Sequence, residues 1–246
     1  MLPGAGRTLN ALAGMPLGQA GGMSAPAACL FDLDGLLLDT EPCHGRAWRE
    51  AAERFGLRLP EAELLQLRGR RRLDNAHQVI AWIAERVGSA PTVDELLAVQ
   101  QPIARRLLTR AAAMDGAPEL LRQCRQRQVA MALVTSSSRD SLELKTAGHP
   151  WLDQIALRIH GDDPALAAGK PAPDPFLLAA ERLGVKPGDC WAFEDSPAGA
   201  IAAARAGCRV HVLLPPGLSA EERERLYPGD WVFLESLRQL RLDGPL

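Results

Sequence analysis

Two aspartates separated by one residue, in the segment Phe31-Asp32-Leu33-Asp34-Gly35, are the first residues of this chain that could do chemistry. They directly follow a short apolar run, and the glycine lets the chain turn after them. A carboxylate fixed at the end of a buried strand can act as a nucleophile, and a second one nearby can donate and accept a proton. The same pattern is common in simple polar turns, so it gains meaning only together with other segments.

Three further segments place hydroxyl, ammonium and carboxylate groups next to apolar runs or helical stretches, as the first segment does with its two aspartates. They contain Thr135 and Ser136, Lys170, and the pair Glu194 and Asp195. The first segment follows an apolar run, the last one ends an apolar run, and the lysine precedes a helical stretch. Lysine is rare here, with three residues in the chain, so a lysine in a loop suggests that a compact positive charge is needed there.

The elements that must position these residues alternate along the chain from residue 27 onwards. Apolar runs followed by polar residues predict buried strands at 27–31, 129–134, 155–159, 190–193 and 210–214. Helical stretches of roughly ten residues lie between the runs, and most are closed by a glycine. This alternation predicts an α/β fold with a doubly wound, Rossmann-like parallel sheet, whose ligands bind at the carboxyl ends of the strands.

One long segment, residues 42–112, interrupts this alternation with helical patterns alone. Apolar residues recur there at helical spacing. Thr92 and Glu95 form a capping box for a further helix, in which Pro102 should kink or interrupt the run. The segment therefore predicts an all-helical cap domain, inserted into a core domain that comprises residues 27–41 and 113–246.

Composition narrows the class of protein further. The 246 residues are 47% hydrophobic but hold no apolar run near the roughly 18 residues of a membrane span. A net charge of −2 argues against a general nucleic-acid binder, and the five scattered cysteines favour reduced thiols. We expect a cytoplasmic protein with no nucleic-acid or membrane partner, monomeric or weakly homo-oligomeric. Residues 1–26, rich in glycine and nearly uncharged, are expected to be a disordered extension.

In order and in spacing, the four segments resemble the four motifs of the haloacid dehalogenase (HAD) superfamily of phosphohydrolases. The segments are residues 31–35, 135–138, 169–174 and 193–197, and the resemblance extends over residues 28 to about 215. The helical insert after the first strand is similar to the subgroup of phosphoglycolate phosphatase, sugar-phosphate phosphatases and beta-phosphoglucomutase. The resemblance implies a phosphatase whose substrate is a small-molecule phosphate ester, with sugar phosphates favoured.

Phosphoryl transfer needs a nucleophile, positive charge at the equatorial oxygens and a proton for the leaving alcohol, and these residues can supply all three. Asp32 would attack phosphorus to form an aspartyl phosphate, while Asp34 would protonate the leaving oxygen and later activate water. Thr135, the amide of Ser136 and the ammonium of Lys170 would hold the transferred phosphoryl group.

Attack of a carboxylate on a phosphate dianion requires a cation to screen the repulsion, and hard oxygen ligands favour Mg²⁺. By the resemblance, the Asp32 carboxylate, the Asp34 backbone carbonyl and Asp195 bind this ion, and Glu194 ligates it directly or through water. An alternative role for Glu194 and Asp195 is to cap the helix that begins near residue 197. The two roles are compatible.

Substrate specificity is expected to come from the cap. His44, Arg68 and Arg72 match positions that approach the substrate in the sugar-phosphate branch, and the excess of arginine over acidic residues in the cap would attract an anion. An ordinary surface histidine and a solvated arginine face are the alternatives. Arg139 stands one position after the basic residue of the mutase pattern, which favours a phosphatase, although Arg139 could still bind a distal phosphate.

Two other functions stay open at this point. One is a phosphosugar mutase of the beta-phosphoglucomutase type, in which a second sugar-phosphate hydroxyl replaces water. The other is a catalytically inactive module that retains the fold for binding or as a scaffold. Loss of one of the chemical residues of the four segments would favour the inactive module, and none is lost.

Overall fold

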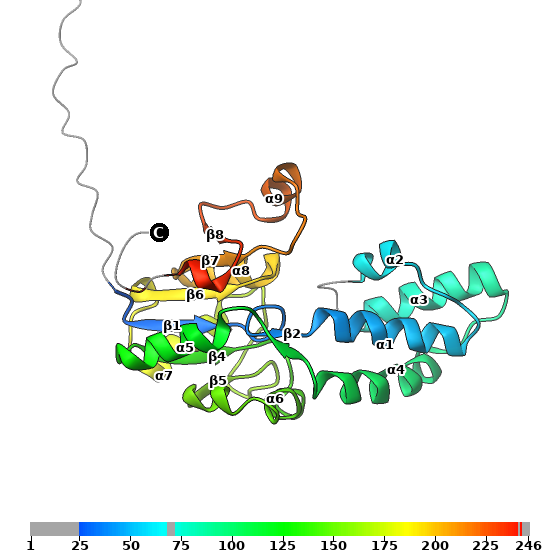
Figure 1. Ribbon diagram of the computed structural model, residues 1–246, viewed down its shortest axis with the longest axis horizontal. Helices are drawn as coiled ribbons and strands as arrows, with labels where there is room; N and C mark the ends of the chain where they lie inside the picture. Colours follow the sequence, from blue (N-terminus) through cyan, green and yellow to red (C-terminus); the bar gives the residue numbers. More distant parts are fainter. Residues whose placement is uncertain (1–24, 68–71, 241, 243–246) are drawn as a thin grey trace, which may run out of the picture.

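The computed structural model describes residues 25–67, 72–240 and 242, and it consists of a larger part built on a sheet and a smaller, helical part (Figure 1). Apart from its last two residues, the segment 1–26 that we expected to be disordered lies outside the described residues. Within the described ranges, no helix has the length and the apolar character that crossing a lipid bilayer requires.

The larger part is organised around a six-stranded sheet in which neighbouring strands run parallel, in the order β5-β4-β1-β6-β7-β8. The strands are β1 (Ala28–Phe31), β4 (Ala130–Val134), β5 (Leu157–Ile159), β6 (Cys190–Glu194), β7 (Arg209–Leu213) and β8 (Val232–Leu234). β1 is fully buried between β4 and β6. Along the chain, β4 and β5 are added on one side of β1, and β6, β7 and β8 are then added on its other side. The direction in which strands are added therefore reverses beside β1, and doubly wound sheets bind their ligands at such a point.

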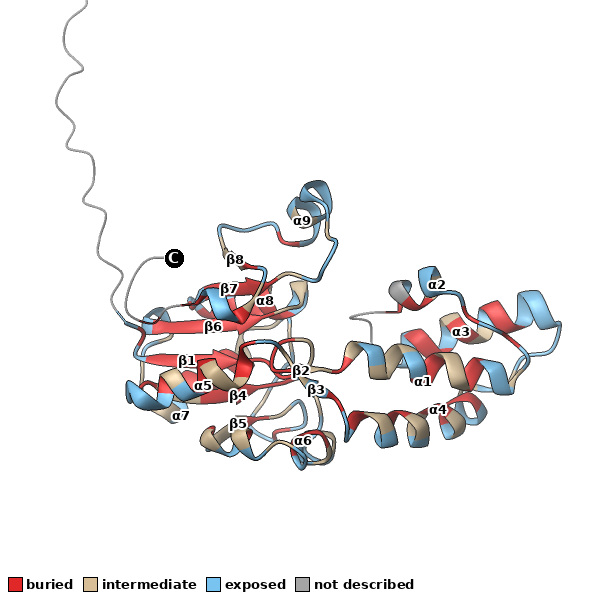
Figure 2. Ribbon diagram, in the orientation of Figure 1, coloured by how far each residue is buried: buried red, intermediate tan, exposed pale blue. Residues whose placement is uncertain are grey.

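Helices cover both faces of the sheet, which explains why its strands are continuous apolar runs rather than alternating ones (Figure 2). Cys29 and Phe31 of β1 point to the face that holds α5 (Ala117–Gln126) and α6 (Arg139–Thr146). Ala28 and Leu30 point to the opposite face, under α7 (Asp174–Leu183) and α8 (Pro197–Ala206). The remaining short helices are η1 (Pro150–Gln154), η2 (Pro187–Asp189), α9 (Ala220–Leu226) and η3 (Leu237–Gln239).

The predicted doubly wound α/β sheet is confirmed, and its five predicted strands match β1, β4, β5, β6 and β7 to within two residues at each end. The sequence reasoning missed β8 and the helix α9 before it. β8 has only three residues, which is too short to stand out from a loop by its apolar pattern.

The smaller part contains α1 (Glu41–Arg54), α2 (Glu61–Gln66), α3 (Arg72–Val87) and α4 (Val93–Leu108). It has an apolar core of its own, separate from the two clusters that flank the sheet, and α1 packs along α4. The chain enters this part after β2 (Leu38–Asp39) and leaves it before β3 (Ala112–Ala113), and these two short strands pair antiparallel. The predicted helical insert after the first strand is therefore present, and it lies beyond the carboxyl ends of the sheet strands (Figure 1).

Pro102 does not interrupt the helix, contrary to one of the two outcomes expected for it. α4 runs unbroken from residue 93 to residue 108 with Pro102 inside it, and the capping box of Thr92 and Glu95 begins it as predicted. A proline inside a helix costs about 3 kcal/mol. Buried residues on both sides of the proline, among them Leu97 and Ala104, offset this cost by packing both halves of α4 against the rest of the cap.

Candidate active site

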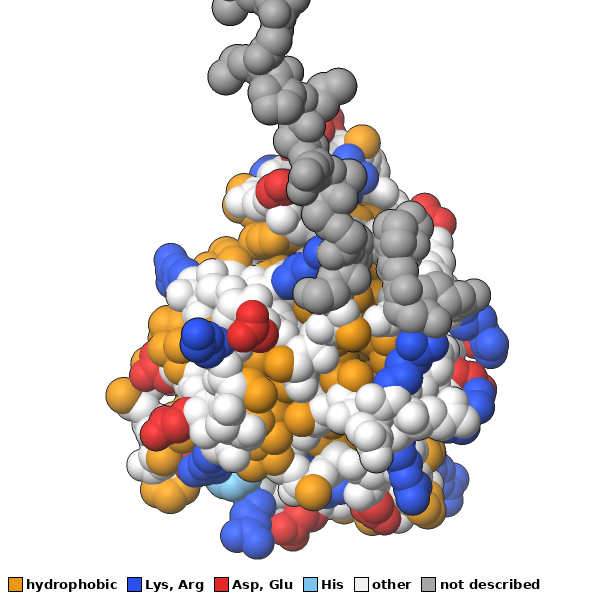
Figure 3. Space-filling model, turned by 90° about the vertical axis from the view of Figure 1, so that its left-hand side faces the viewer, with side chains coloured by type: hydrophobic (Ala, Val, Ile, Leu, Met, Phe, Trp, Pro, Cys, Tyr) orange, Lys and Arg blue, Asp and Glu red, His pale blue; other side chains and the backbone are white. Residues whose placement is uncertain are grey.

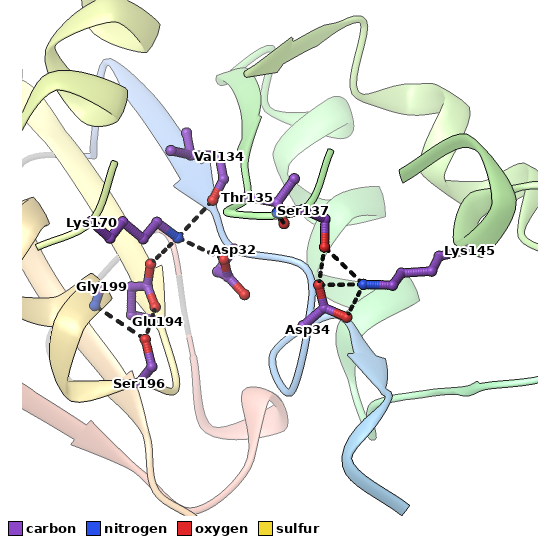
Figure 4. A network of polar contacts seen from close by, with 10 residues as sticks. All are labelled: Asp32, Asp34, Val134, Thr135, Ser137, Lys145, Lys170, Glu194, Ser196 and Gly199. Atoms are coloured by element: carbon purple, nitrogen blue, oxygen red, sulfur yellow. Dashed lines mark hydrogen bonds and ion pairs between the residues drawn. The ribbon is translucent and has the colours of Figure 1, made fainter. Parts of the chain in front are cut away.

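The predicted chemical residues of the core meet at the carboxyl ends of three neighbouring strands (Figure 4). Asp32 follows β1, Thr135 follows β4, and Glu194 is the last residue of β6. These strands are parallel and adjacent, so their ends lie at the same edge of the sheet. At the end of the core opposite to the cap, side chains of both charges are instead scattered among apolar ones (Figure 3).

Lys170 is the centre of the first group of contacts. Its Nζ donates hydrogen bonds to Asp32 Oδ1 at 2.6 Å, to Glu194 Oε1 at 2.5 Å and to the carbonyl oxygen of Val134 at 2.8 Å. All three ammonium protons therefore have acceptors, which is what makes this buried cation tolerable. Burial alone would lower the pKa of Lys170, but the carboxylates of Asp32 and Glu194 raise it above its ordinary value.

Negative charge is in excess around that lysine. One carboxylate oxygen from each of Asp32, Glu194 and Asp195 lies within 4.8 Å of the others. Burial raises the pKa of Glu194 to about 7, with Lys170 opposing this shift and Asp32 adding to it. Burial also raises the pKa values of Asp32 and Asp195. Three carboxylates facing one ammonium group are stable as anions only if a further positive charge joins them.

The donor set and the local backbone fit a hard divalent cation. Oxygen ligands at this spacing suit such an ion, and among the described residues none donates a hydrogen bond to the Asp195 carboxylate. Two glycines make room for the acidic side chains. A Cβ at Gly35 would collide with the Asp195 carboxylate, and one at Gly199 would collide with that of Glu194. Gly35 also adopts the left-handed φ of 82° that the turn after Asp34 requires.

Neither Glu194 nor Asp195 caps the following helix, so the alternative structural role predicted for them is wrong. Ser196 is the N-cap of α8: its Oγ accepts a hydrogen bond from the Gly199 amide at 3.1 Å and donates one to Glu194 Oε2 at 3.1 Å. Because Ser196 occupies the N-cap position of α8, the carboxylates of Glu194 and Asp195 remain available to form an acidic cluster with that of Asp32. Tyr227, the single tyrosine, donates to the backbone oxygen of Asp195 at 2.5 Å and holds this loop from the other side.

Asp34 belongs to a second group of contacts, built around a residue that sequence reasoning missed. Lys145 Nζ donates to Asp34 Oδ1 at 2.6 Å and to Oδ2 at 2.8 Å, and Ser137 Oγ donates to Oδ2 at 2.9 Å. Burial opposes ionisation of Asp34, but Lys145 lowers the pKa of this carboxyl below its ordinary value. The signal was available: Lys145 stands three residues after Leu142, on the buried face of α6.

The predicted phosphoryl-binding residues occupy the loop after β4. Thr135 is buried, with its amide donating to Ile159 O at 3.0 Å and its Oγ1 accepting from the Ser137 amide at 3.1 Å. Ser136 is next in the chain and exposed. Arg139 is not brought into the cluster: its side chain is 70% exposed and pairs with Glu143 on the surface of α6.

The three predicted substrate-binding residues of the cap differ in where the structure places them. His44 lies in the first turn of α1 and is half-buried. Burial lowers the pKa of His44, the charge of Asp34 opposes this shift and the charge of Lys145 adds to it. Arg72 begins α3 and is exposed. Arg68, the third predicted cap residue, lies outside the described residues.

Comparison with known proteins gives a consistent result. The family model of haloacid dehalogenase-like hydrolases matches residues 26–207. A probable pseudouridine-5'-phosphatase of Drosophila melanogaster is 38% identical over 200 residues, which cover 79% of this chain and 84% of that protein. Hexitol phosphatase A of Escherichia coli (strain K12) is 32% identical over 211 residues, covering 86% and 91% of the two chains.

A solved structure is also similar. It is the crystal structure of a HAD family hydrolase from Deinococcus radiodurans R1 with bound phosphate and sodium. The two chains are 30% identical, the TM-score is 0.72, and the match covers 89% of this chain and 95% of that one. The likeness extends to nearly the whole length of both chains, sheet and helical insert together.

Proposed function

The chain belongs to the haloacid dehalogenase-like hydrolases and is a phosphatase of that family, and from this premise we propose that it is a Mg²⁺-dependent phosphatase of small phosphomonoesters, sugar phosphates in particular. One observation carries the proposal. Asp32 lies at the end of the central strand, with the Lys170 ammonium at 2.6 Å and the carboxylates of Glu194 and Asp195 beside it. This is the charge arrangement that an aspartate nucleophile for phosphate esters needs.

The reaction proceeds in two displacements at phosphorus. In the first, an Oδ of Asp32 forms a bond to phosphorus, the bond from phosphorus to the ester oxygen breaks, and the leaving alcohol receives a proton from Asp34. In the second, water attacks the aspartyl phosphate and gives its proton to Asp34, while the bond from phosphorus to Asp32 breaks. Inorganic phosphate leaves and the enzyme is restored.

The metal is held by the acidic cluster in this proposal. The carboxylates of Asp32, Glu194 and Asp195, together with the backbone carbonyl of Asp34, would bind Mg²⁺. When bound, Mg²⁺ supplies positive charge that screens the repulsion between Asp32 and the phosphate dianion. Lys170 neutralises part of the same negative charge and keeps the Asp32 carboxylate oriented.

The phosphoryl group and the rest of the substrate are bound by different parts of the molecule. The Thr135 hydroxyl and the Ser136 amide, at the end of β4, would bind the equatorial oxygens of the phosphoryl group. His44, Arg68 and Arg72 of the cap would contact the leaving group. The similar phosphatases named above act, by their names, on phosphates of polyhydroxylated small molecules, which supports a substrate of that kind.

A panel of phosphomonoesters tests the proposal, with phosphate release measured in the presence of Mg²⁺ and after its removal by a chelator. The panel includes phosphoglycolate, hexitol phosphates, pseudouridine 5'-phosphate and both glucose phosphates, and Asp32→Asn is the control for contaminating activity. Release that needs the metal and Asp32 supports the phosphatase. Conversion of beta-glucose 1-phosphate to glucose 6-phosphate without release would make the protein a mutase. If the folded protein releases phosphate from none of these esters and converts none of them, the result would favour the inactive module.

A further inference from the structure

Two of the three lysines of this chain lie in the active site, and each contacts a different aspartate of the Asp32-Leu33-Asp34 segment. Lys170 contacts Asp32, and Lys145 contacts Asp34. Figure 4 shows Lys145 approaching Asp34 from the side away from Asp32 and Lys170. The carboxylate of Asp34 is therefore directed away from the acidic cluster, although only one residue separates the two aspartates in the sequence.

The contacts of Lys145 form a closed polar triangle. Its Nζ donates to both oxygens of Asp34 and, at 2.8 Å, to Ser137 Oγ, and that hydroxyl donates in turn to Asp34 Oδ2 at 2.9 Å. The three residues come from three separate segments: the turn after β1, the loop after β4 and the last turn of α6. A carboxylate that accepts hydrogen bonds from two separate segments, here the loop after β4 and the helix α6, has little freedom to rotate.

The burial of Lys145 marks this arrangement as more than a surface ion pair. The lysine side chain is 3% exposed, against 25% for Asp34. Burying an ammonium group costs free energy that its hydrogen bonds must offset, and the packing of α6 by itself would need only an apolar residue at this position. The structural need of α6 does not explain the lysine, whereas the orientation of Asp34 does.

We infer that Lys145 is a positioning residue for hydrolysis of the aspartyl phosphate: it holds the Asp34 carboxylate where this group can take the proton of the attacking water. The inference rests on the proposed function. In this step the water oxygen forms a bond to phosphorus, the bond from phosphorus to Asp32 breaks, and the water proton passes to Asp34. Without Lys145, the Asp34 carboxylate loses two of its three hydrogen bonds and is free to turn toward Lys170 or the metal.

A substrate with a good leaving group separates the two displacements. p-Nitrophenyl phosphate needs little help from a general acid, so its first displacement depends weakly on Asp34, while the second displacement depends on Asp34 as a base. With Lys145→Met we expect an initial burst of one p-nitrophenolate per active site, followed by a steady state on the order of 10²-fold slower than that of the unaltered protein. Lys186→Met, at an exposed lysine, is the matched control and should behave as the unaltered protein.

A second comparison shows whether Lys145 acts through Asp34. If it does, adding Lys145→Met to Asp34→Asn should slow the steady state by no more than about twofold, because the two changes remove the same function. A Lys145→Met protein with an unchanged steady state would overturn the inference. So would a folded variant that slows burst and steady state equally, since the lysine would then be structural only. Failure of the proposed function looks different: the unaltered protein would release no p-nitrophenolate, or Asp32→Asn would still release it.

Discussion

The core and the cap hold their polar residues in different ways. In the core, Lys170 and Lys145 are buried and bind their aspartates at 2.6 Å, so charges are fixed in place before any substrate arrives. In the cap, Arg72 is exposed, and ion pairs such as Arg46 with Glu50 lie on the surface. A preorganised site lowers the barrier of the chemical step, whereas exposed groups become ordered only when a ligand meets them. Changes in the core should therefore act on turnover, and changes in the cap on substrate affinity.

The largest effect is expected from Asp32→Asn, which replaces the nucleophile and leaves its size unchanged. Turnover should fall on the order of 10⁴-fold or more for every active ester. Phosphate release measures the loss, and circular dichroism with thermal unfolding checks that the fold persists. Activity within tenfold of the unaltered protein would show that another group attacks phosphorus.

Lys170→Met should damage stability as well as turnover, because it leaves Asp32 and Glu194 buried without their cation. Removing one partner of a buried ion pair costs about 3 to 5 kcal/mol. We expect the free energy of unfolding, measured by urea titration without Mg²⁺, to fall by about that amount. The matched cap variant is Arg86→Met, which breaks a pair with Glu63 at the surface of the cap and should lower the free energy of unfolding far less than Lys170→Met does. Equal costs for the two variants would contradict the contrast between core and cap.

The sheet of the core should also be sensitive to acid at His211, a buried residue of β7 stacked on Phe193. Burial, with a contribution from Arg209, lowers the pKa of His211 from 6.5 to about 4. The unfolded chain therefore binds a proton at a higher pH than the folded one. Stability linked to His211 is complete above pH 6.5 and declines as the pH falls toward 4, by about 3 kcal/mol in total.

His211→Phe isolates this contribution, since the ring stack persists without a titrating group. Urea unfolding at several pH values should show a weaker loss of stability below pH 6.5 in the variant than in the unaltered protein. His77→Gln, at an exposed histidine of α3, should leave the profile unchanged. If the loss of stability with falling pH were the same in His211→Phe and in the unaltered protein, protonation of His211 would not contribute to that loss.

The smallest effect is expected in the cap. Arg72→Gln should raise KM for the best ester of the panel by about tenfold and change kcat by less than about threefold, because it removes a charge that meets only bound substrate. Arg105→Gln, at an exposed arginine of α4, serves as the control and should leave both constants unchanged. A large loss of kcat with an unchanged KM for Arg72→Gln would place this arginine in the chemical step instead.

The fold could be predicted because its main signals are local. Strands buried on both faces are continuous apolar runs, and the capping box of α4 is visible as Thr92 and Glu95 in the sequence. The short strand β8 and the helix α9 carry no comparable local signal. Pro102 shows the limit of local rules, since packing on both sides of it keeps α4 continuous.

The site could be predicted only in part, for the same reason. Strand ends located Asp32 and Glu194, but the contact between Lys145 and Asp34 joins residues 111 positions apart, and only the three-dimensional structure brings them together. The sequence left open that Glu194 or Asp195 caps the helix α8, whereas in the structure Ser196 is its N-cap. Arg139 was expected near a distal phosphate, but its pairing with Glu143 four residues on keeps it at the surface.

The most direct test of the central claim is to trap the phosphorylated enzyme. In Asp34→Asn, p-nitrophenyl phosphate should still phosphorylate the protein, while hydrolysis of the intermediate should be slow. After acid quenching and proteolysis, mass spectrometry should find one phosphoryl group on the peptide that contains Asp32, and hydroxylamine should remove it. Release of p-nitrophenolate with this peptide unmodified, or with the phosphoryl group on another residue, would contradict the proposed mechanism.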